Sequence, residues 1–367
     1  MRQFFPGALG AVLLLAVPLA HAGLSLKAIF MLSGVRGQFG QMALDVAHHR
    51  LYVTVTGSDA LLVLDLNTGA VRGKITDLDQ PRGVVYLPHN NVLAVNNGGS
   101  GDLNLYAADS LIQISSITFG SRTGGLRYDA ATGRLYLGYD AGHQSGIAIL
   151  DSNGRPLVQL PLGSHPSGFV VDAAAKRLYV NLPDSREIAV FDLSDDKRLA
   201  TWPLGIESGT NFPMALDAIH GWLFVATRSP DRLLVLEART GRILQTLMAP
   251  GDVGDLFYNA GTQELYASGG VGRIVVYASG KTGRLLESED IHTLRGARTS
   301  LLDPVIGHYY LAVPAGRGSV AEIRVYVVTA NEQGNALWTM LNCRWDWPKR
   351  CVWLVCRLHA RAMNRLP

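Results

Sequence analysis

The stretch GRLYLGY, residues 133 to 139, alternates leucines with Tyr136 and Gly138, and this period of two residues is typical of a β-strand. Turn residues lie just upstream, after Asp129. Nearly the same order of apolar and polar positions returns along the chain. We therefore take the repetition, and not the single strand, as the guide to the fold.

The phrase occurs seven times, as ALDVAHHRLYVTV, VYLPHNNVLAVNN, RYDAATGRLYLGY, VVDAAAKRLYVNL, ALDAIHGWLFVAT, FYNAGTQELYASG and LLDPVIGHYYLAV. The equivalent second-strand positions, 42 to 45 residues apart, are Tyr52, Ala94, Tyr136, Tyr179, Phe224, Tyr266 and Tyr310. Short strands and tight turns at this period, with no helical pattern, are typical of propeller blades. Seven repeats predict seven blades.

A second apolar phrase follows in each repeat, as in LLVLD ending at Asp65 and IAVFD ending at Asp192. Turn residues come next, such as Asn67-Thr68-Gly69 in the first repeat. An outer segment follows the turn, such as RILQTL in the fifth repeat. Each repeat thus contains four strands. The sequence predicts an all-β fold, a seven-bladed β-propeller of four-stranded antiparallel blades.

The first and last segments of the repeat region complement each other. The last repeat ends at IRVYVV without an outer strand, and LSLKAIFML at residues 24 to 32 precedes the first inner strand without a blade of its own. We expect the N-terminal segment to be the fourth strand of the last blade. This exchange would close the ring and remove an exposed sheet edge.

These phrases also carry a family resemblance. Residues 24 to 328 resemble the YVTN-repeat β-propellers, the YncE-like group of exported bacterial proteins, in RLYV and LYVNL and in NFPMALD, GARTSL and AEIRVY. The resemblance implies the propeller fold and export, but no particular chemistry. Many members of the group place an Asp-His pair at the start of blade one, where this chain has Gly40 and Gln41.

Residues 1 to 22 read as a secretory signal. A basic start and an apolar stretch precede Ala20-His21-Ala22, so we expect cleavage after Ala22 and a mature protein that is periplasmic or secreted. An uncleaved membrane anchor is the alternative, but the apolar run is shorter than the ~20 residues of a bilayer span. We expect no transmembrane span in the mature protein.

Residues 329 to 367 do not continue the repeat, which leaves residues 23 to 328 as the propeller domain. This tail contains all three cysteines, Cys343, Cys351 and Cys356, at spacings that match no zinc pattern. One interpretation is a membrane-surface or partner-binding extension that uses Trp and Arg. The other, which we favour, is a disordered or non-native extension.

The charge distribution argues against nucleic-acid binding. The formal charge of +3 arises in the tail, where six Lys or Arg oppose two acids, so the propeller itself is near neutral. No signature of a cofactor site occurs, and neither H-E-x-x-H nor G-x-S-x-G is present. We therefore predict no bound cofactor and no resident metal.

The loops that lead into the inner strands should gather around the central opening on one face. Their candidate ligand-binding residues are Arg36, Arg82, Arg122, His165, Asn211, Asp252, Asp255 and Arg298. Four converging arginines suit a small anionic ligand through forked, charge-assisted hydrogen bonds. Alternatively, the arginines pair with Asp252, Asp255 and carbonyl groups to connect neighbouring blades.

Two functions from different classes remain open at this point. The first is an exported binding module for a small anionic ligand or a protein partner. The second is a metal-dependent propeller enzyme, a lactonase-like hydrolase or an oxidoreductase, with Asp252 or Asp255 as its central carboxylate. We favour the binding module because no catalytic constellation is visible in the sequence.

Overall fold

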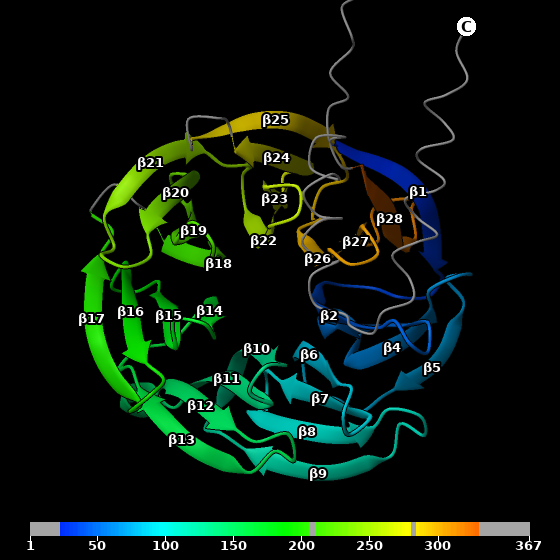
Figure 1. The fold of residues 1–367 in the computed structure, drawn as a ribbon. Helices are drawn as coiled ribbons and strands as arrows, with labels where there is room; N and C mark the ends of the chain where they lie inside the picture. The colour runs from blue at the N-terminus through cyan, green and yellow to red at the C-terminus, as the bar shows by residue number, and fades with distance from the viewer. Residues whose placement is uncertain (1–22, 206–209, 280–283, 330–367) are drawn as a thin grey trace, which may run out of the picture. The chain divides into compact units, whose positions relative to one another are not determined.

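The computed structural model describes residues 23–205, 210–279 and 284–329, and these form seven four-stranded antiparallel sheets. The sheets are arranged radially around a central axis, each with its first strand innermost (Figure 1). The predicted seven-bladed propeller is therefore confirmed. The predicted signal segment and the tail beyond Thr329 lie outside the described residues.

The first four blades follow the order of the chain, each built from four consecutive strands. Blade 1 contains β2 (Phe39–Asp45), β3 (Arg50–Val55), β4 (Ala60–Asp65) and β5 (Val71–Ile75), and blade 2 contains β6 (Pro81–Leu87), β7 (Val92–Asn97), β8 (Asp102–Ala107) and β9 (Gln113–Thr118). Blade 3 contains β10 (Arg122–Asp129), β11 (Arg134–Asp140), β12 (Gly146–Leu150) and β13 (Pro156–Pro161), and blade 4 contains β14 (Phe169–Asp172), β15 (Arg177–Leu182), β16 (Glu187–Asp192) and β17 (Lys197–Pro203).

The remaining blades include the one that closes the ring. Blade 5 contains β18 (Thr210–Asp217), β19 (Trp222–Arg228), β20 (Arg232–Glu237) and β21 (Ile243–Met248), and blade 6 contains β22 (Val253–Asn259), β23 (Glu264–Gly269), β24 (Arg273–Ser279) and β25 (Leu285–His292). Blade 7 contains β26 (Thr299–Asp303), β27 (His308–Val313), β28 (Ala321–Thr329) and β1 (Gly23–Leu32). Two short 3₁₀ turns, η1 (Thr56–Ser58) and η2 (Gly142–Gln144), complete the described elements.

Ring closure uses the first strand of the chain, as predicted. β1 pairs antiparallel with β28, from Gly23 opposite Thr329 to Leu32 opposite Ala321. The Phe30 ring of β1 packs over Gly69, whose φ of +72° and lack of a side chain leave room for it in the β4–β5 turn of blade 1. The first strand therefore joins blade 7 to blade 1 through its side chains as well as its backbone.

The hydrophobic core lies between blades, in seven clusters. Each second strand contributes a large side chain that is almost fully buried, except in blade 2, where Ala94 takes this position. The second and third strands are mostly buried and the inner strands combine buried with half-buried residues, whereas the outer strands alternate and face solvent on one side, as in β9 and β21. The repeated aromatic residue is thus a packing residue between neighbouring sheets.

A second repeated position connects the blades by hydrogen bonds. Two residues beyond the aromatic position, Asn96 donates to the carbonyl of Gly124 at 2.8 Å and Asn181 to that of Phe212 at 2.8 Å. Ser268 donates to the carbonyl of Arg298 at 2.7 Å. Each donor thus holds the backbone at the start of the next blade's inner strand. These backbone segments line the central channel.

We expect Phe30→Ala to lower the free energy of unfolding by about 3–5 kcal/mol, because it leaves a cavity between blades 7 and 1. Ile29→Ala in the same strand is the matched control, since Ile29 is 44% exposed, and we expect it to cost less than about 1 kcal/mol. Chemical denaturation of the full chain measures both values. Equal losses for the two variants would contradict the role assigned to β1.

Candidate functional site

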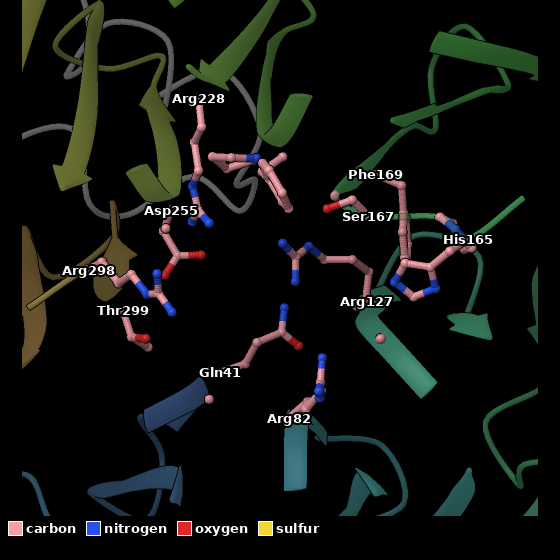
Figure 2. Close-up of a pocket in the computed structure, with 18 residues that line it drawn as sticks. Gln41, Arg82, Arg127, His165, Ser167, Phe169, Arg228, Asp255, Arg298 and Thr299 are labelled. Atoms are coloured by element: carbon pink, nitrogen blue, oxygen red, sulfur yellow. The ribbon is translucent and has the colours of Figure 1, made fainter. Parts of the chain in front are cut away.

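The inner strands surround a central cavity of about 330 Å³ at the ends where they begin. All seven blades contribute to it, and its charged and titratable lining consists of Arg82, Arg127, His165, Arg228, Asp255 and Arg298 (Figure 2). Apolar surface comes from Pro166, Phe169, Phe212 and Pro213. The candidate site is therefore cationic, with an apolar wall on the side of blades 4 and 5.

Arg127 projects into the middle of the channel from β10. Strand register places it opposite Tyr136, and the residues at the equivalent position in the other six blades are Ala43, Val85, Val170, Ala215, Phe257 and Leu301. Arg127 is thus the one charged member of an otherwise apolar ring. Burial lowers the pKa of its guanidinium, and the nearby Asp255 partly offsets this effect.

Gln41 of β2 holds the Arg127 side chain in place. With its amide turned to suit the neighbouring groups, the Gln41 oxygen accepts from Arg127 and its nitrogen donates to the carbonyl of Leu126 at 3.2 Å. Arg127 Nη1 also donates to that same carbonyl at 3.0 Å. Gln41 therefore presents the guanidinium to the cavity.

Asp255 of β22 faces Arg127 across the channel (Figure 2). Its Oδ2 accepts from the backbone N–H of Ser300 at 2.8 Å. Burial nevertheless raises the pKa of the carboxyl to about 6, against the opposing effects of Ser300, Arg127 and Arg298. Gln41, Arg127 and Asp255 also line a second cavity of about 280 Å³ further along the channel, so these three residues lie where the two cavities meet.

Arg228 and Arg298 form an ion-pair cluster with Asp252 at one side of the cavity. Arg298 Nη1 lies 2.7 Å from both oxygens of Asp252, and Arg228 Nη2 lies 3.1 Å from Oδ1. Arg228 also donates to the carbonyl of Val253 and stacks on Phe212, with its guanidinium carbon 4.3 Å from the ring centroid. These contacts fix both guanidinium groups at the cavity wall.

The structure brings together four of the residues that the sequence singled out. Arg82, His165, Asp255 and Arg298 line the cavity, and Asp252 lies directly behind Arg298. Arg82 is exposed, and its guanidinium makes no ion pair within the described part of the chain. His165 lies 3.7 Å from Asp140, and burial lowers the pKa of its imidazole.

The other three predicted residues are outside the cavity lining. Arg122 is 61% exposed and pairs with Asp140 at 2.8 Å. Arg36 is exposed in the turn before β2, where its backbone is held by Ser58. Asn211 is buried and donates to Asn181 and to the carbonyl of Glu187, so it connects blades 4 and 5.

Arg127, Arg228 and Gln41 are site residues that the sequence reasoning did not single out. The predicted residues lie in the loops that lead into the inner strands or in the first residues of these strands. Gln41 and Arg127 lie further along inner strands β2 and β10, and Arg228 ends a second strand. The repeat itself contained a signal for Arg127, because alignment of the seven blades shows one charge against six apolar residues. The family resemblance marked the position of Gln41, but it gave no indication that Gln41 contacts Arg127.

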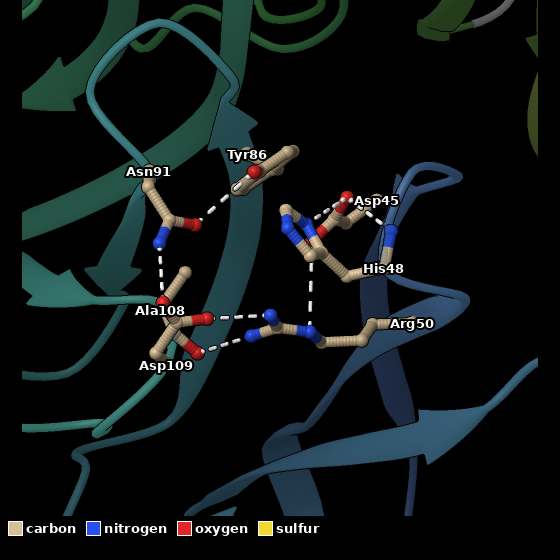
Figure 3. Close-up of polar contacts among 7 residues, drawn as sticks. All are labelled: Asp45, His48, Arg50, Tyr86, Asn91, Ala108 and Asp109. Atoms are coloured by element: carbon tan, nitrogen blue, oxygen red, sulfur yellow. Dashed lines mark hydrogen bonds and ion pairs between the residues drawn. The ribbon is translucent and has the colours of Figure 1, made fainter.

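A different polar cluster lies at the opposite ends of the inner strands (Figure 3). Arg50 donates to the carbonyl of Ala108 at 2.8 Å and pairs with Asp109, which connects blades 1 and 2. His48 Nδ1 lies 2.8 Å from Asp45 within blade 1. His48 lies in the turn between β2 and β3, beside the contacts that connect blades 1 and 2.

The described residues contain no group of three or more His, Cys, Asp or Glu side chains that could hold a metal ion. Asp252 and Asp255 face arginines and a backbone donor instead of other ligating groups. In the same part of the chain, no helix has the length and apolar character needed to cross a membrane.

Comparisons with known proteins agree with the fold. No family model matches the chain. The uncharacterized proteins YncE of Salmonella typhi and of Salmonella typhimurium are each 27% identical over 169 residues, which is 45% of this chain and 47% of each relative. The match therefore spans about half the length of these curated relatives.

Two solved structures share the architecture. A chain of the mitotic checkpoint complex superposes with a TM-score of 0.69 at 15% identity, covering 89% of this chain and 99% of that one. A chain of Kuenenia stuttgartiensis hydrazine synthase gives a TM-score of 0.68 at 14% identity, covering 82% and 99%. At such identities the likeness shows the fold alone.

Asp255 should make stability depend on pH. Because its pKa in the folded state is raised from 3.8 to about 6, its contribution is fully present below about pH 4 and is lost as the pH rises through 6. That loss is at most about 3 kcal/mol. Asp255→Asn does not ionise, so we expect its free energy of unfolding to fall less between pH 4 and pH 7.

Chemical denaturation at several pH values measures this difference. Asp195→Asn is the matched control, because the Asp195 side chain is 48% exposed beside β17, and it should follow the wild-type pH dependence. If Asp255→Asn showed the same pH dependence as the wild type, the carboxyl would not be destabilised by burial.

Proposed function

Because the chain is a YncE-like seven-bladed propeller, we propose that it acts as an exported binding module whose central cavity takes a small anionic ligand. The periplasm or the extracellular space is the proposed location. The observation that carries the proposal is the set of four arginines at one cavity, Arg82, Arg127, Arg228 and Arg298. Guanidinium groups match carboxylate and phosphate oxygens through forked hydrogen bonds.

The balance of charge around the cavity supports an anion. Four guanidinium groups line the cavity, whereas only two carboxylates, those of Asp255 in the lining and Asp252 behind Arg298, offset their charge. If the arginines were purely structural, each would pair with an acidic residue. Arg298 and Arg228 do so, because both pair with Asp252. Arg82 does not fit this structural explanation, because its guanidinium has no acidic partner among the described residues. A bound anion would neutralise the remaining positive charge.

The shape of the cavity suits a small molecule. Its volume of about 330 Å³ lies at the lower end of the range of ligand pockets, roughly 300–1,000 Å³. Its wall combines charged groups with proline and phenylalanine surface, the usual mixture for such sites. A protein partner would instead contact the loops around the rim, so loss of binding on substitution of a cavity residue separates the two alternatives.

Thermal unfolding of the full chain tests the proposal with the sodium salts of acetate, succinate and phosphate at constant ionic strength. We expect at least one anion to raise the midpoint, because a ligand at 100 times its Kd stabilises the folded state by about 2.7 kcal/mol. Arg82→Gln should remove most of this gain, since a hydrogen bond to a charged group contributes about 1.5–3 kcal/mol.

Arg36→Gln is the matched control, because Arg36 precedes an inner strand on the same face but lies outside the cavity lining. It should respond to the anions as the wild type does. The proposal would be overturned if no anion raised the midpoint, or if Arg82→Gln and Arg36→Gln responded alike.

A further inference from the structure

The positive charge of the central cavity is divided between two sides. At one side, Asp252 is shared by Arg298, at 2.7 Å, and Arg228, at 3.1 Å. Asp252 offsets one of these two charges, and Asp255, which interacts with Arg127 more strongly than with Arg298, lies toward the middle of the cavity. Because Arg228 also stacks on Phe212, its position at the wall is set by the protein before any ligand arrives.

The second positive charge belongs to Arg82 on β6. Its side chain packs against Gly98 and, within the described residues, has no acidic neighbour at ion-pair distance. His165 also lines the cavity, and burial lowers the pKa of its imidazole, which disfavours a further positive charge there. Figure 2 shows Arg82 and Arg228 projecting from different walls, with Arg127 between them.

The middle of the cavity carries little net charge. Arg127 and Asp255 face each other there, and each reduces the effect of the other's charge. Gln41 adds neutral hydrogen-bonding groups at the same level. The cavity therefore has two cationic ends separated by a nearly balanced pair.

We propose that the ligand of this cavity is a short dicarboxylate, with one carboxylate bound at Arg82 and the other at Arg228 and Arg298. This inference rests on the proposed function and specifies its ligand class. A phosphate group concentrates its charge at a single point, so it would leave one cationic end without a partner. The carbon chain of a dicarboxylate would lie between the two ends, against the apolar surface of Pro166 and Pro213.

Calorimetric titration of the full chain at pH 7 compares acids that differ by one carboxylate, succinate with butyrate and adipate with hexanoate, and includes inorganic phosphate. We expect at least one dicarboxylate to bind about tenfold or more tightly than its monocarboxylate partner and than phosphate, because it forms a second charge-assisted pair. Arg82→Gln should remove that advantage, whereas it should change monocarboxylate binding little. Arg36→Gln should preserve the wild-type order.

The failure of this inference is distinguishable from the failure of the proposed function. If butyrate and hexanoate bound as tightly as the dicarboxylates, or if phosphate bound most tightly, with Arg82→Gln weakening that binding, the cavity would still be an anion site. The dicarboxylate assignment alone would then be overturned. If none of the five anions bound, both the assignment and the proposed function would be overturned.

Discussion

The pairing of β1 with β28 closes the ring, and the position of every channel residue depends on it. In an open ring the inner strands could splay, because neighbouring blades are joined by side-chain packing and single hydrogen bonds instead of sheet pairing. Closure forces seven inner strands to share one axis. Residues distant in the sequence, such as Gln41 and Arg127, consequently meet at the centre.

The same repeat that builds the blades also orients the site. Buried donors on the second strands, Asn96, Asn181 and Ser268, hold the carbonyl groups at the start of the next inner strand. One of these carbonyls belongs to Arg298, whose side chain enters the central cavity. Polar residues that could have been ligands are therefore used as supports, and the chemistry of the cavity is left to the residues that depart from the repeat.

The fold was predictable because the alternation of apolar and polar residues recurs in seven repeats. An ambiguous strand in one repeat can therefore be assigned from the other six. The site was predictable only in part. Arg82, at the start of inner strand β6, and Arg298, just before inner strand β26, follow from their places, but Arg122 turns away to Asp140. Arg127 was not predicted, because an inner strand normally alternates packing residues, and the cost of burying a charge argues against an arginine there.

In the proposed function, the arginines of the channel hold an anion that the chain itself does not supply. The most direct measurement is the electron density of the central cavity in crystals of the protein grown with succinate. We expect an ordered dianion that contacts the guanidinium of Arg82 at one end and those of Arg228 and Arg298 at the other. A cavity that contained only water, with Arg82 paired to a carboxylate of the protein, would contradict it.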